Sequence, residues 1–371
     1  MIETAESQHR TGASLQNALP IRLAVFRGVG LFVCLAVSQH GKASDVEFVV
    51  GDYMEQEDGD WDPNMGPLRN PFGVDFDSKG QMYVVELGGG RVHRINSDGE
   101  TITIAGDGSK SYEGDGGPAR NATFNGMHNC AMTRDDQLLI SDSWNHCVRV
   151  IDLKSGTIDT LIGTGVEGFS GDRGPANEAS FNYVMCITLD PAKRRLQIAD
   201  LKNRRIREVD LASSTVTTIA GNGKKGVPIN GNDATESPLV DPRAVAADRL
   251  GNTYILERGG HALRVVDRHG KIKTVAGTGE KGWKDGPALE ATFGAPKHLC
   301  VDDRDRVYIA DDQNAAIRRY DPSTKTVETI LGRGIGDPRI RLSHPHGVSV
   351  YRGDLYVVDS GNHRILQMPI P

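Results

Sequence analysis

Two histidines, an arginine and a lysine are the residues of this sequence best placed for chemistry, because they share one position in a repeating pattern. The position lies about 14 residues before a recurrent acidic residue, with a one-residue insertion in the third repeat and a deletion in the sixth. Over six repeats it holds Phe72, His128, Met185, Arg243, Lys297 and His346. His298 and His344 lie close by in the sequence. Side chains of these types can hold an anion or transfer a proton.

At neutral pH, Arg243 and Lys297 are cationic, and we expect His128 and His346 to be mostly neutral beside them. The set therefore predicts a site for a small anion such as a carboxylate or phosphate, held bidentately by Arg243 with Lys297 as a point charge. A catalytic zinc needs about three protein ligands, and a fixed guanidinium repels a metal cation. We therefore expect no metal and no cofactor. His128 and His346 are the candidate catalytic bases.

The acidic residue itself occurs in all six repeats, so we attribute it to architecture rather than to catalysis. We predict that it caps the turn that follows it. Asn residues recur in four of these turns, and His146, His261 and His363 share one further position, which we also attribute to the repeat. The six acidic residues are Glu86, Asp142, Asp200, Glu257, Asp311 and Asp359.

The elements that must position these residues are short β-strands. Each repeat contains four segments of alternating β-branched and polar residues, bounded by Gly, Asp and Asn. Successive acidic residues are 48 to 58 residues apart, which fits four strands and a linker. We therefore predict an all-β, six-bladed β-propeller of four-stranded antiparallel blades. The repeats span residues 70–107, 126–163, 183–221, 241–277, 295–332 and 344–371.

The ends of the chain indicate how the ring of blades closes. The sixth repeat ends after its third strand, whereas residues 46–52 resemble an isolated fourth strand. We predict that this N-terminal strand completes the last blade, near residues 362–368. Such closure removes the sheet edges that an open array would expose.

The linkers between blades repeat a Gly-Asp…Gly-Pro-Ala pattern that precedes Phe124, Phe181 or Phe293. We expect a turn, a short helical piece and an aromatic anchor. The linker Asp residues lack the alternating oxygen ligands of a known calcium loop, so we interpret them as turn residues. We interpret the acidic run at residues 55–62 as a solvated loop.

The first 43 residues have the parts of a secretory signal peptide. Arg10, Arg22 and Arg27 precede an apolar run at residues 29–37, which leads to Gly41-Lys42-Ala43. The run is too short to span a bilayer as a mature helix. We expect cleavage near Ala43 and export of residues 44–371 as one domain, to the periplasm, cell surface or exterior. The alternative is a disordered N-terminal tail.

Composition narrows the classes of partner. The formal net charge is −6 and aromatic residues make up 6 % of the chain, which argues against a nucleic-acid-binding surface. We expect a monomer without membrane insertion, whose partner is a protein or a small anionic ligand. The four cysteines beyond residue 43 show no CxxC spacing, so we expect them to be small core residues: Cys130, Cys147, Cys186 and Cys300.

The segment 353–365, GDLYVVDSGNHRI, resembles the NHL repeat, and the resemblance extends over residues 46–371. Relatives of this family include an amidating lyase, sensing ectodomains and protein- or RNA-binding propellers, with gluconolactonase and streptogramin lyase propellers more distant. The resemblance implies that the first strand of each blade is innermost, so the variable position stands at the mouth of the central channel. We expect its side chains to face a water-filled channel rather than the core. In the lyase, histidines at this position in three blades hold zinc. His128 and His346 fit that pattern, but the fourth blade offers Arg243.

Two functions therefore remain open from the sequence, because one fold carries many activities. The first is a binding or interaction scaffold that takes a small anionic ligand at the channel mouth. The second is a lyase or hydrolase, similar to the amidating lyase or the lactonases, with its active site at the same mouth.

Overall fold

Each repeat folds into a four-stranded antiparallel sheet in the computed structural model, which describes residues 46–51 and 68–370. The central strands, such as Met82–Glu86 and Thr253–Glu257, are buried at every position, because both faces of each sheet pack against neighbouring sheets. Blades 1 and 2 comprise β2 (Pro71–Phe76), β3 (Met82–Glu86), β4 (Val92–Ile95) and β5 (Thr101–Ala105), then β6 (Met127–Met132), β7 (Gln137–Asp142), β8 (Cys147–Asp152) and β9 (Thr157–Ile162).

The remaining blades follow the same order. Blades 3 and 4 comprise β10 (Val184–Leu189), β11 (Arg195–Asp200), β12 (Arg205–Asp210) and β13 (Thr215–Ala220), then β14 (Pro242–Ala247), β15 (Thr253–Glu257), β16 (Ala262–Val266) and β17 (Ile272–Ala276). Blade 5 comprises β19 (His298–Val301), β20 (Val307–Asp311), β21 (Ala316–Asp321) and β22 (Thr326–Leu331), with the short β18 (Gly286–Pro287) at its outer edge. Blade 6 comprises β23 (Pro345–Tyr351), β24 (Asp354–Asp359), β25 (Arg364–Pro369) and β1 (Glu47–Val50).

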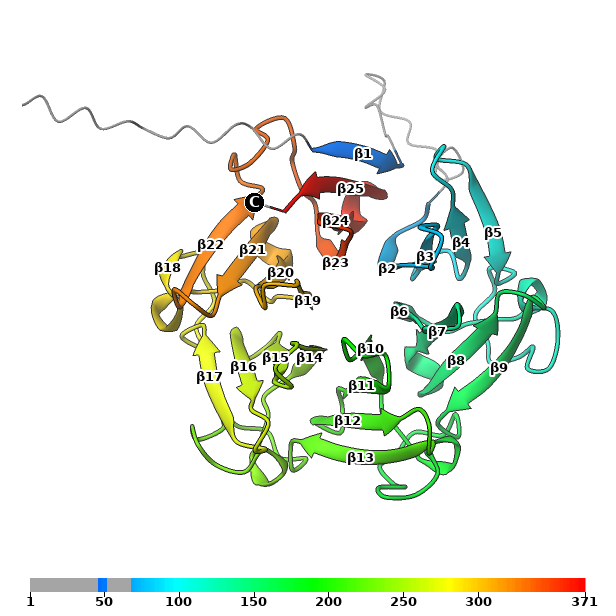
Figure 1. Cartoon of the computed structure of the whole chain (residues 1–371), viewed down its shortest axis with the longest axis horizontal. Helices are drawn as coiled ribbons and strands as arrows, with labels where there is room; N and C mark the ends of the chain where they lie inside the picture. Colours follow the sequence, from blue (N-terminus) through cyan, green and yellow to red (C-terminus); the bar gives the residue numbers. More distant parts are fainter. Residues whose placement is uncertain (1–45, 52–67, 371) are drawn as a thin grey trace, which may run out of the picture. The chain divides into compact units, whose positions relative to one another are not determined.

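The first strand of each blade lies innermost, and the six inner strands surround a central axis (Figure 1). Each of them contacts the inner strand of the next blade, and β23 contacts β2 to close the circle. The predicted six-bladed propeller is therefore confirmed. In this ring, blade 1 lies opposite blade 4, and blade 2 lies opposite blade 5.

Closure by the N-terminal strand is also confirmed. β1 pairs antiparallel with β25, and Glu47 lies opposite Gln367 while Phe48 lies opposite Leu366. The outer edge of β25 is thereby covered by a strand from the other end of the chain. The sheet order β1-β25-β24-β23 contains strands from both termini in one blade.

The predicted linker features form one repeated structural unit. Short 3-10 helices follow the Gly-Pro-Ala motif, for example at Ala119–Asn121 and Ala176–Glu178. The linker Asp residues pair with arginines of the third strand that are fully buried. The pairs are Asp115–Arg149 at 2.6 Å, Asp172–Arg207 at 2.8 Å and Asp285–Arg318 at 2.6 Å. The side chains of Phe124, Phe181 and Phe293 are also fully buried, with these guanidinium groups over their rings.

The recurrent acidic residue holds the loop before the first strand, as well as the turn that follows it. Asp142 accepts hydrogen bonds from the backbone N–H of Asn125 at 2.7 Å and from the Asn145 amide at 2.8 Å. In blades 1 and 4, which lack the Asn, the acid is Glu and a glycine lies three residues later. A Cβ at Gly260 would lie 2.8 Å from Oε2 of Glu257, so the longer acid requires glycine there. The architectural interpretation of the acidic residue is confirmed.

The three repeat histidines also serve the architecture. In each of them, Nδ1 accepts a hydrogen bond from a backbone N–H. The pairs are His146 with Tyr183 at 3.2 Å, His261 with Ala295 at 3.2 Å and His363 with Asn70 at 2.8 Å. Each acceptor lies in one blade and each donor in the segment that starts the next. These histidines therefore join neighbouring blades, as expected for residues of the repeat.

Some of the sequence predictions concern residues that the structure does not describe. The proposed signal peptide at residues 1–43 and the acidic run at residues 55–62 lie outside the described ranges. Cys130, Cys147 and Cys186 are buried, Cys300 is half-buried, and all four are free thiols. Among residues 46–51 and 68–370, no helix is both long enough and apolar enough to cross a membrane.

Candidate functional site at the channel mouth

The variable position lies at one end of the inner strands, where β-bulges set its direction. The pairing of the first two strands shifts register between Pro71 and Gly73, so Phe72 is the bulged residue. Equivalent shifts occur at His128, Met185, Arg243 and His346. A bulge re-aims the side chain of the extra residue. We call the six residues at this position the channel mouth: Phe72, His128, Met185, Arg243, Lys297 and His346.

A position at the mouth of a water-filled channel predicts exposed side chains. The side chains of the channel mouth are instead largely buried. Relative exposure is 4 % for Phe72, 7 % for His128, 6 % for Met185 and 4 % for Arg243. Lys297 and His346 are half-buried. The expectation of solvent-facing side chains is therefore wrong for four of the six. Six inner strands meet around one axis here, and their side chains cover one another.

Arg243 is a buried cation with no carboxylate of the described residues within salt-bridge distance. Its Nη1 donates to the backbone carbonyl of Met185 at 3.4 Å, and its Nε is buried without a hydrogen-bond partner. Within the described part of the chain it forms no salt bridge. The neighbouring Arg258 pairs instead with Asp241 at 2.9 Å. Burial, together with the charge of Arg258, lowers the pKa of Arg243 to about 10, so the guanidinium remains cationic at neutral pH.

Asp312, which the sequence analysis missed, is a carboxylate in contact with Lys297 and His346 of the channel mouth. It lies 3.7 Å from Nζ of Lys297, 3.0 Å from Nδ1 of His344 and 3.5 Å from Nε2 of His346. Burial acts to raise its pKa, but contacts with His346 and Lys297 outweigh burial and lower it. Burial and Arg243 lower the pKa of Lys297. Nδ1 of His346 is buried without a hydrogen-bond partner.

His128 is held in one tautomer by its surroundings. Its Nδ1 lies 2.8 Å from the carbonyl oxygen of Gly126 and 2.9 Å from Oγ of Ser143. Ser143 donates its own proton to the carbonyl of Val184, so Nδ1 of His128 must be the donor in both contacts. Nε2 of the neutral ring is then an acceptor. Burial and Arg243 lower the pKa of His128 well below its usual range, which keeps the ring neutral.

A second variable position supplies the residues that the sequence analysis missed. Ser143, Arg258 and Asp312 each directly follow the recurrent acid, in the turn that lies beside the mouth. A comparison of the residue types at this position in the six repeats would have found them. In chain order it holds Leu87, Ser143, Leu201, Arg258, Asp312 and Ser360.

The mouth is closed below by two polar residues from opposite blades. The side-chain amide nitrogen of Asn129 in blade 2 lies 3.0 Å from Nε2 of His298 in blade 5. Oδ1 of Asn129 accepts the backbone N–H of Ile187, and Nδ1 of His298 accepts that of Val348. These bonds fix both side chains across the axis, so they block the channel next to the mouth.

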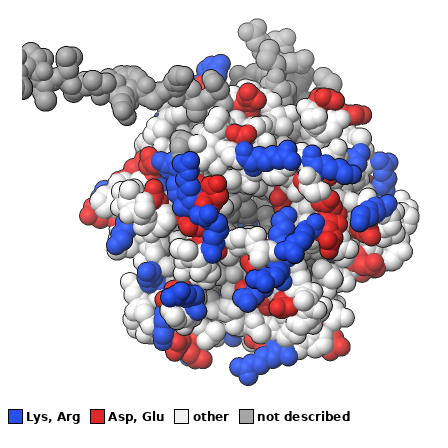
Figure 2. All heavy atoms as spheres, in the orientation of Figure 1, with Lys and Arg blue, Asp and Glu red and all other residues white. Residues whose placement is uncertain are grey.

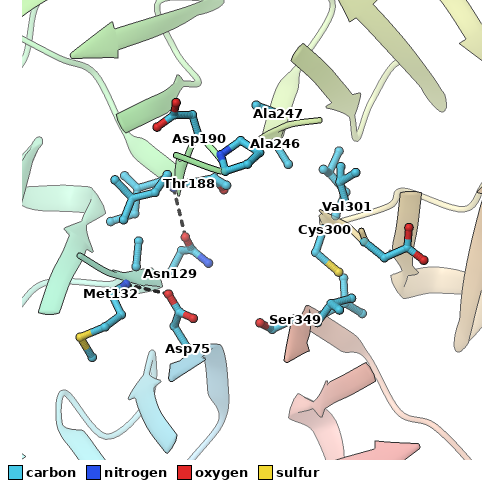
Figure 3. Close-up of a pocket in the computed structure, with 18 of the residues that line it drawn as sticks. Asp75, Asn129, Met132, Thr188, Asp190, Ala246, Ala247, Cys300, Val301 and Ser349 are labelled. Atoms are coloured by element: carbon cyan, nitrogen blue, oxygen red, sulfur yellow. Dashed lines mark hydrogen bonds between the residues drawn. The ribbon is translucent and has the colours of Figure 1, made fainter. Parts of the chain in front are cut away.

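A separate cavity of about 360 Å³ lies at the other end of the inner strands (Figure 3). Small side chains such as Thr188, Cys300 and Ser349 line it, together with Asp75. The oxygens of Asp75 accept the backbone N–H groups of Met132 at 2.6 Å and Phe76 at 2.8 Å. This carboxylate is therefore already used in joining blades 1 and 2.

Charged side chains gather near the axis. On the face in Figure 2, lysine and arginine side chains lie around a central hollow, with aspartate and glutamate side chains among them. The described ranges contain no group of three or more His, Cys, Asp or Glu side chains that could hold a metal ion.

Comparisons with known proteins agree with this fold. The NHL repeat profile matches residues 342–368. Protein SUPPRESSOR OF QUENCHING 1, chloroplastic, of Arabidopsis thaliana is 30 % identical over 262 residues, covering 64 % of this chain and 24 % of that protein. NHL repeat-containing protein 2 of Homo sapiens is 24 % identical over 260 residues, covering 60 % of this chain and 35 % of that protein. The matches thus span about a quarter to a third of these relatives.

Among solved structures, an auxiliary nutrient binding protein from Bacteroides ovatus superposes with a TM-score of 0.63 at 16 % identity, covering 87 % of this chain and 76 % of that one. At this identity the likeness concerns the fold alone. Six four-stranded blades, the repeat residues that join them and the matched repeat profile together identify the chain as an NHL-repeat β-propeller.

Proposed function

We propose that this propeller is a binding protein that takes a small anionic ligand at its channel mouth. The observation that carries the proposal is Arg243, a cation with 4 % exposure and no salt bridge to any described residue. An isolated buried charge costs several kcal/mol unless it is paired. A bound anion supplies the missing partner.

The surrounding groups suit such a ligand. Arg243 can hold a carboxylate or phosphate bidentately, and Lys297 adds a point charge on the neighbouring blade. Lys297 is already near Asp312, at 3.7 Å, so Arg243 provides the main attraction. His128, Met185, Phe72 and His346 form the remaining walls.

The test is the melting temperature of the mature chain with and without acetate or phosphate. Arg243→Met and Lys297→Met should each weaken the stabilisation by anions, and Arg243→Met should weaken it more. Lys202→Met is the matched control, because Lys202 is exposed and its loss changes net charge equally. If anions stabilise all variants alike, or none stabilises the wild type, the proposal is wrong.

An enzyme at the same mouth is the second candidate, favoured by the tautomer of His128. Its Nδ1–H is fixed by the Gly126 carbonyl, which leaves Nε2 as a possible general base. In that case His128→Ala or His346→Ala should abolish turnover of a bound ligand, followed by NMR, while binding persists. A ligand that remains unchanged over days with wild-type protein argues for binding alone.

We further propose that the chain is exported and that residues 44–371 act outside the cytoplasm, as a monomeric scaffold for this ligand or for a protein partner. The support is the basic flank, the apolar run and the Gly41-Lys42-Ala43 exit. Mass spectrometry of protein from the native host should find an N-terminus close to Ser44. An intact Met1 on cytoplasmic protein would contradict export.

A further inference from the structure

The channel mouth is divided into two chemically different halves. Arg243 and Lys297 come from the adjacent blades 4 and 5. Phe72 and His128 come from blades 1 and 2, which lie opposite them in the ring. Building on the function proposed above, we infer that the mouth selects a monoanion with a flat apolar body, namely a short aryl monocarboxylate.

The charge balance favours a single negative charge. Among the described residues at the mouth, Arg258 is paired with Asp241 at 2.9 Å, and Lys297 lies 3.7 Å from Asp312. Of these three cations, Arg243 alone has no carboxylate of a described residue within salt-bridge distance, although the charges of Asp241 and Asp312 reach it. One uncompensated positive charge matches a monocarboxylate. A dianion such as phosphate would bring a second negative charge close to Asp312, where it would be repelled.

The opposite half is a continuous group of rings. The Phe72 ring lies 4.0 Å from the His346 ring and 5.1 Å from the His128 ring, between ring centroids. Trp144 extends this group, with its ring 5.8 Å from that of His128. Because both imidazoles are kept neutral by burial, this half offers aromatic surface rather than charge. Aromatic side chains at such distances favour a further flat ring.

The depth of the mouth limits the length of the ligand. The Asn129–His298 contact lies directly below the bulged residues, one position further along β6 and at the start of β19. A carboxylate bound to Arg243 would therefore direct the rest of the ligand outward, past Phe72 and Trp144. A long ligand that passes through the channel is excluded by this floor.

Four probes test the inference by calorimetry at pH 7.5: acetate, phenylacetate, phenylmalonate and 2-phenylethanol. Phenylacetate should bind at least about tenfold more tightly than acetate, because its ring is removed from water. Phenylmalonate, a dianion, and 2-phenylethanol, which is neutral, should both bind more weakly than phenylacetate.

Two ring variants separate the inference from the function on which it rests. Phe72→Leu should reduce the affinity for phenylacetate by a larger factor than the affinity for acetate, so that the two affinities approach each other. Trp144→Leu should also reduce the affinity for phenylacetate more than that for acetate. This second variant provides the test if Phe72→Leu does not fold. Equal binding of acetate and phenylacetate, or tighter binding of phenylmalonate or phosphate, would contradict the selectivity for an aryl monocarboxylate. The proposed binding of small anions would still hold. If no anion binds, the proposed function fails and the inference fails with it.

Discussion

The amide of Asn129 and the imidazole of His298 meet at 3.0 Å across the axis of the propeller, although they are 169 residues apart in the sequence. Each side chain also accepts a backbone N–H from the inner strand of the following blade. Adjacent inner strands belong to different sheets, so their backbone groups depend on side chains for partners. The Asn129–His298 contact therefore ties four blades together at the centre of the ring.

Asn129→Ala should destabilise the fold by about 1–3 kcal/mol, because the buried N–H of Ile187 loses its acceptor. Chemical denaturation of the two proteins measures this difference. Asn252→Ala is a control in the turn between β14 and β15, where the side-chain amide donates to Asp248 of the same turn. An equal effect of the two substitutions would show that the central contact has no special role.

His298 should make the protein less stable in mild acid. Burial, with a contribution from Arg243, lowers its pKa to about 4, whereas an unfolded histidine titrates near 6.5. Between these values the unfolded chain binds a proton that the folded chain does not, so this contribution to stability is present above pH 6.5 and is lost as pH falls toward 4. Asp142 and Asp200, whose pKa values burial raises to about 6, act in the opposite direction.

The comparison is therefore between wild type and His298→Asn, which cannot be protonated. Melting temperatures measured from pH 7.5 to 4.5 should fall more steeply with acid for the wild type. His269→Asn, at an exposed histidine, should follow the wild type. Parallel curves for wild type and His298→Asn would contradict the assignment.

Replacement of the buried Arg207 should cause a large loss in the free energy of unfolding. It is fully buried, 2.8 Å from Asp172 and 3.6 Å from Asp200, with its guanidinium over the Phe181 ring. Arg207→Met leaves the buried Asp200 without its cation and should cost about 3–5 kcal/mol of unfolding free energy. Arg195→Met, which removes an exposed pair with Glu208, should cost less than about 1 kcal/mol.

Removal of β1 should open the ring. A chain that starts at Tyr53 lacks the strand that covers β25, so it exposes a long sheet edge. Compared with a chain that starts at Ser44, it should melt at lower temperature and aggregate, as followed by calorimetry and light scattering. Equal melting temperatures would mean that the pairing of β1 with β25 contributes little to closure.

The fold could be predicted from the sequence because its signals are repeated. Three signals predict the same closed ring of six blades: the recurrent acid, the alternation within strands and the isolated strand at residues 46–52. The location of the mouth was also predictable, since Phe72, His128 and Arg243 differ at a position where the architecture leaves the residue type free.

The contacts within the site could not be predicted from one repeat position. Asp312 lies beside Lys297 because β19 pairs with β20 within blade 5, and the register of this pairing brings the start of one strand next to the end of the other. The burial of Arg243 depends likewise on how closely six inner strands approach. Asn129 and His298 are each ordinary polar residues in a strand, and only the closed ring brings them together.

The most direct test of anion binding by Arg243 is a crystal structure of residues 44–371 with 4-bromobenzoate, whose bromine is located by anomalous scattering. We expect the carboxylate at about 3 Å from the Arg243 guanidinium and the bromine on the side of Phe72 and Trp144. A bromine peak only in the cavity lined by Thr188, Cys300 and Ser349, or no peak at the mouth at saturating ligand, would contradict it.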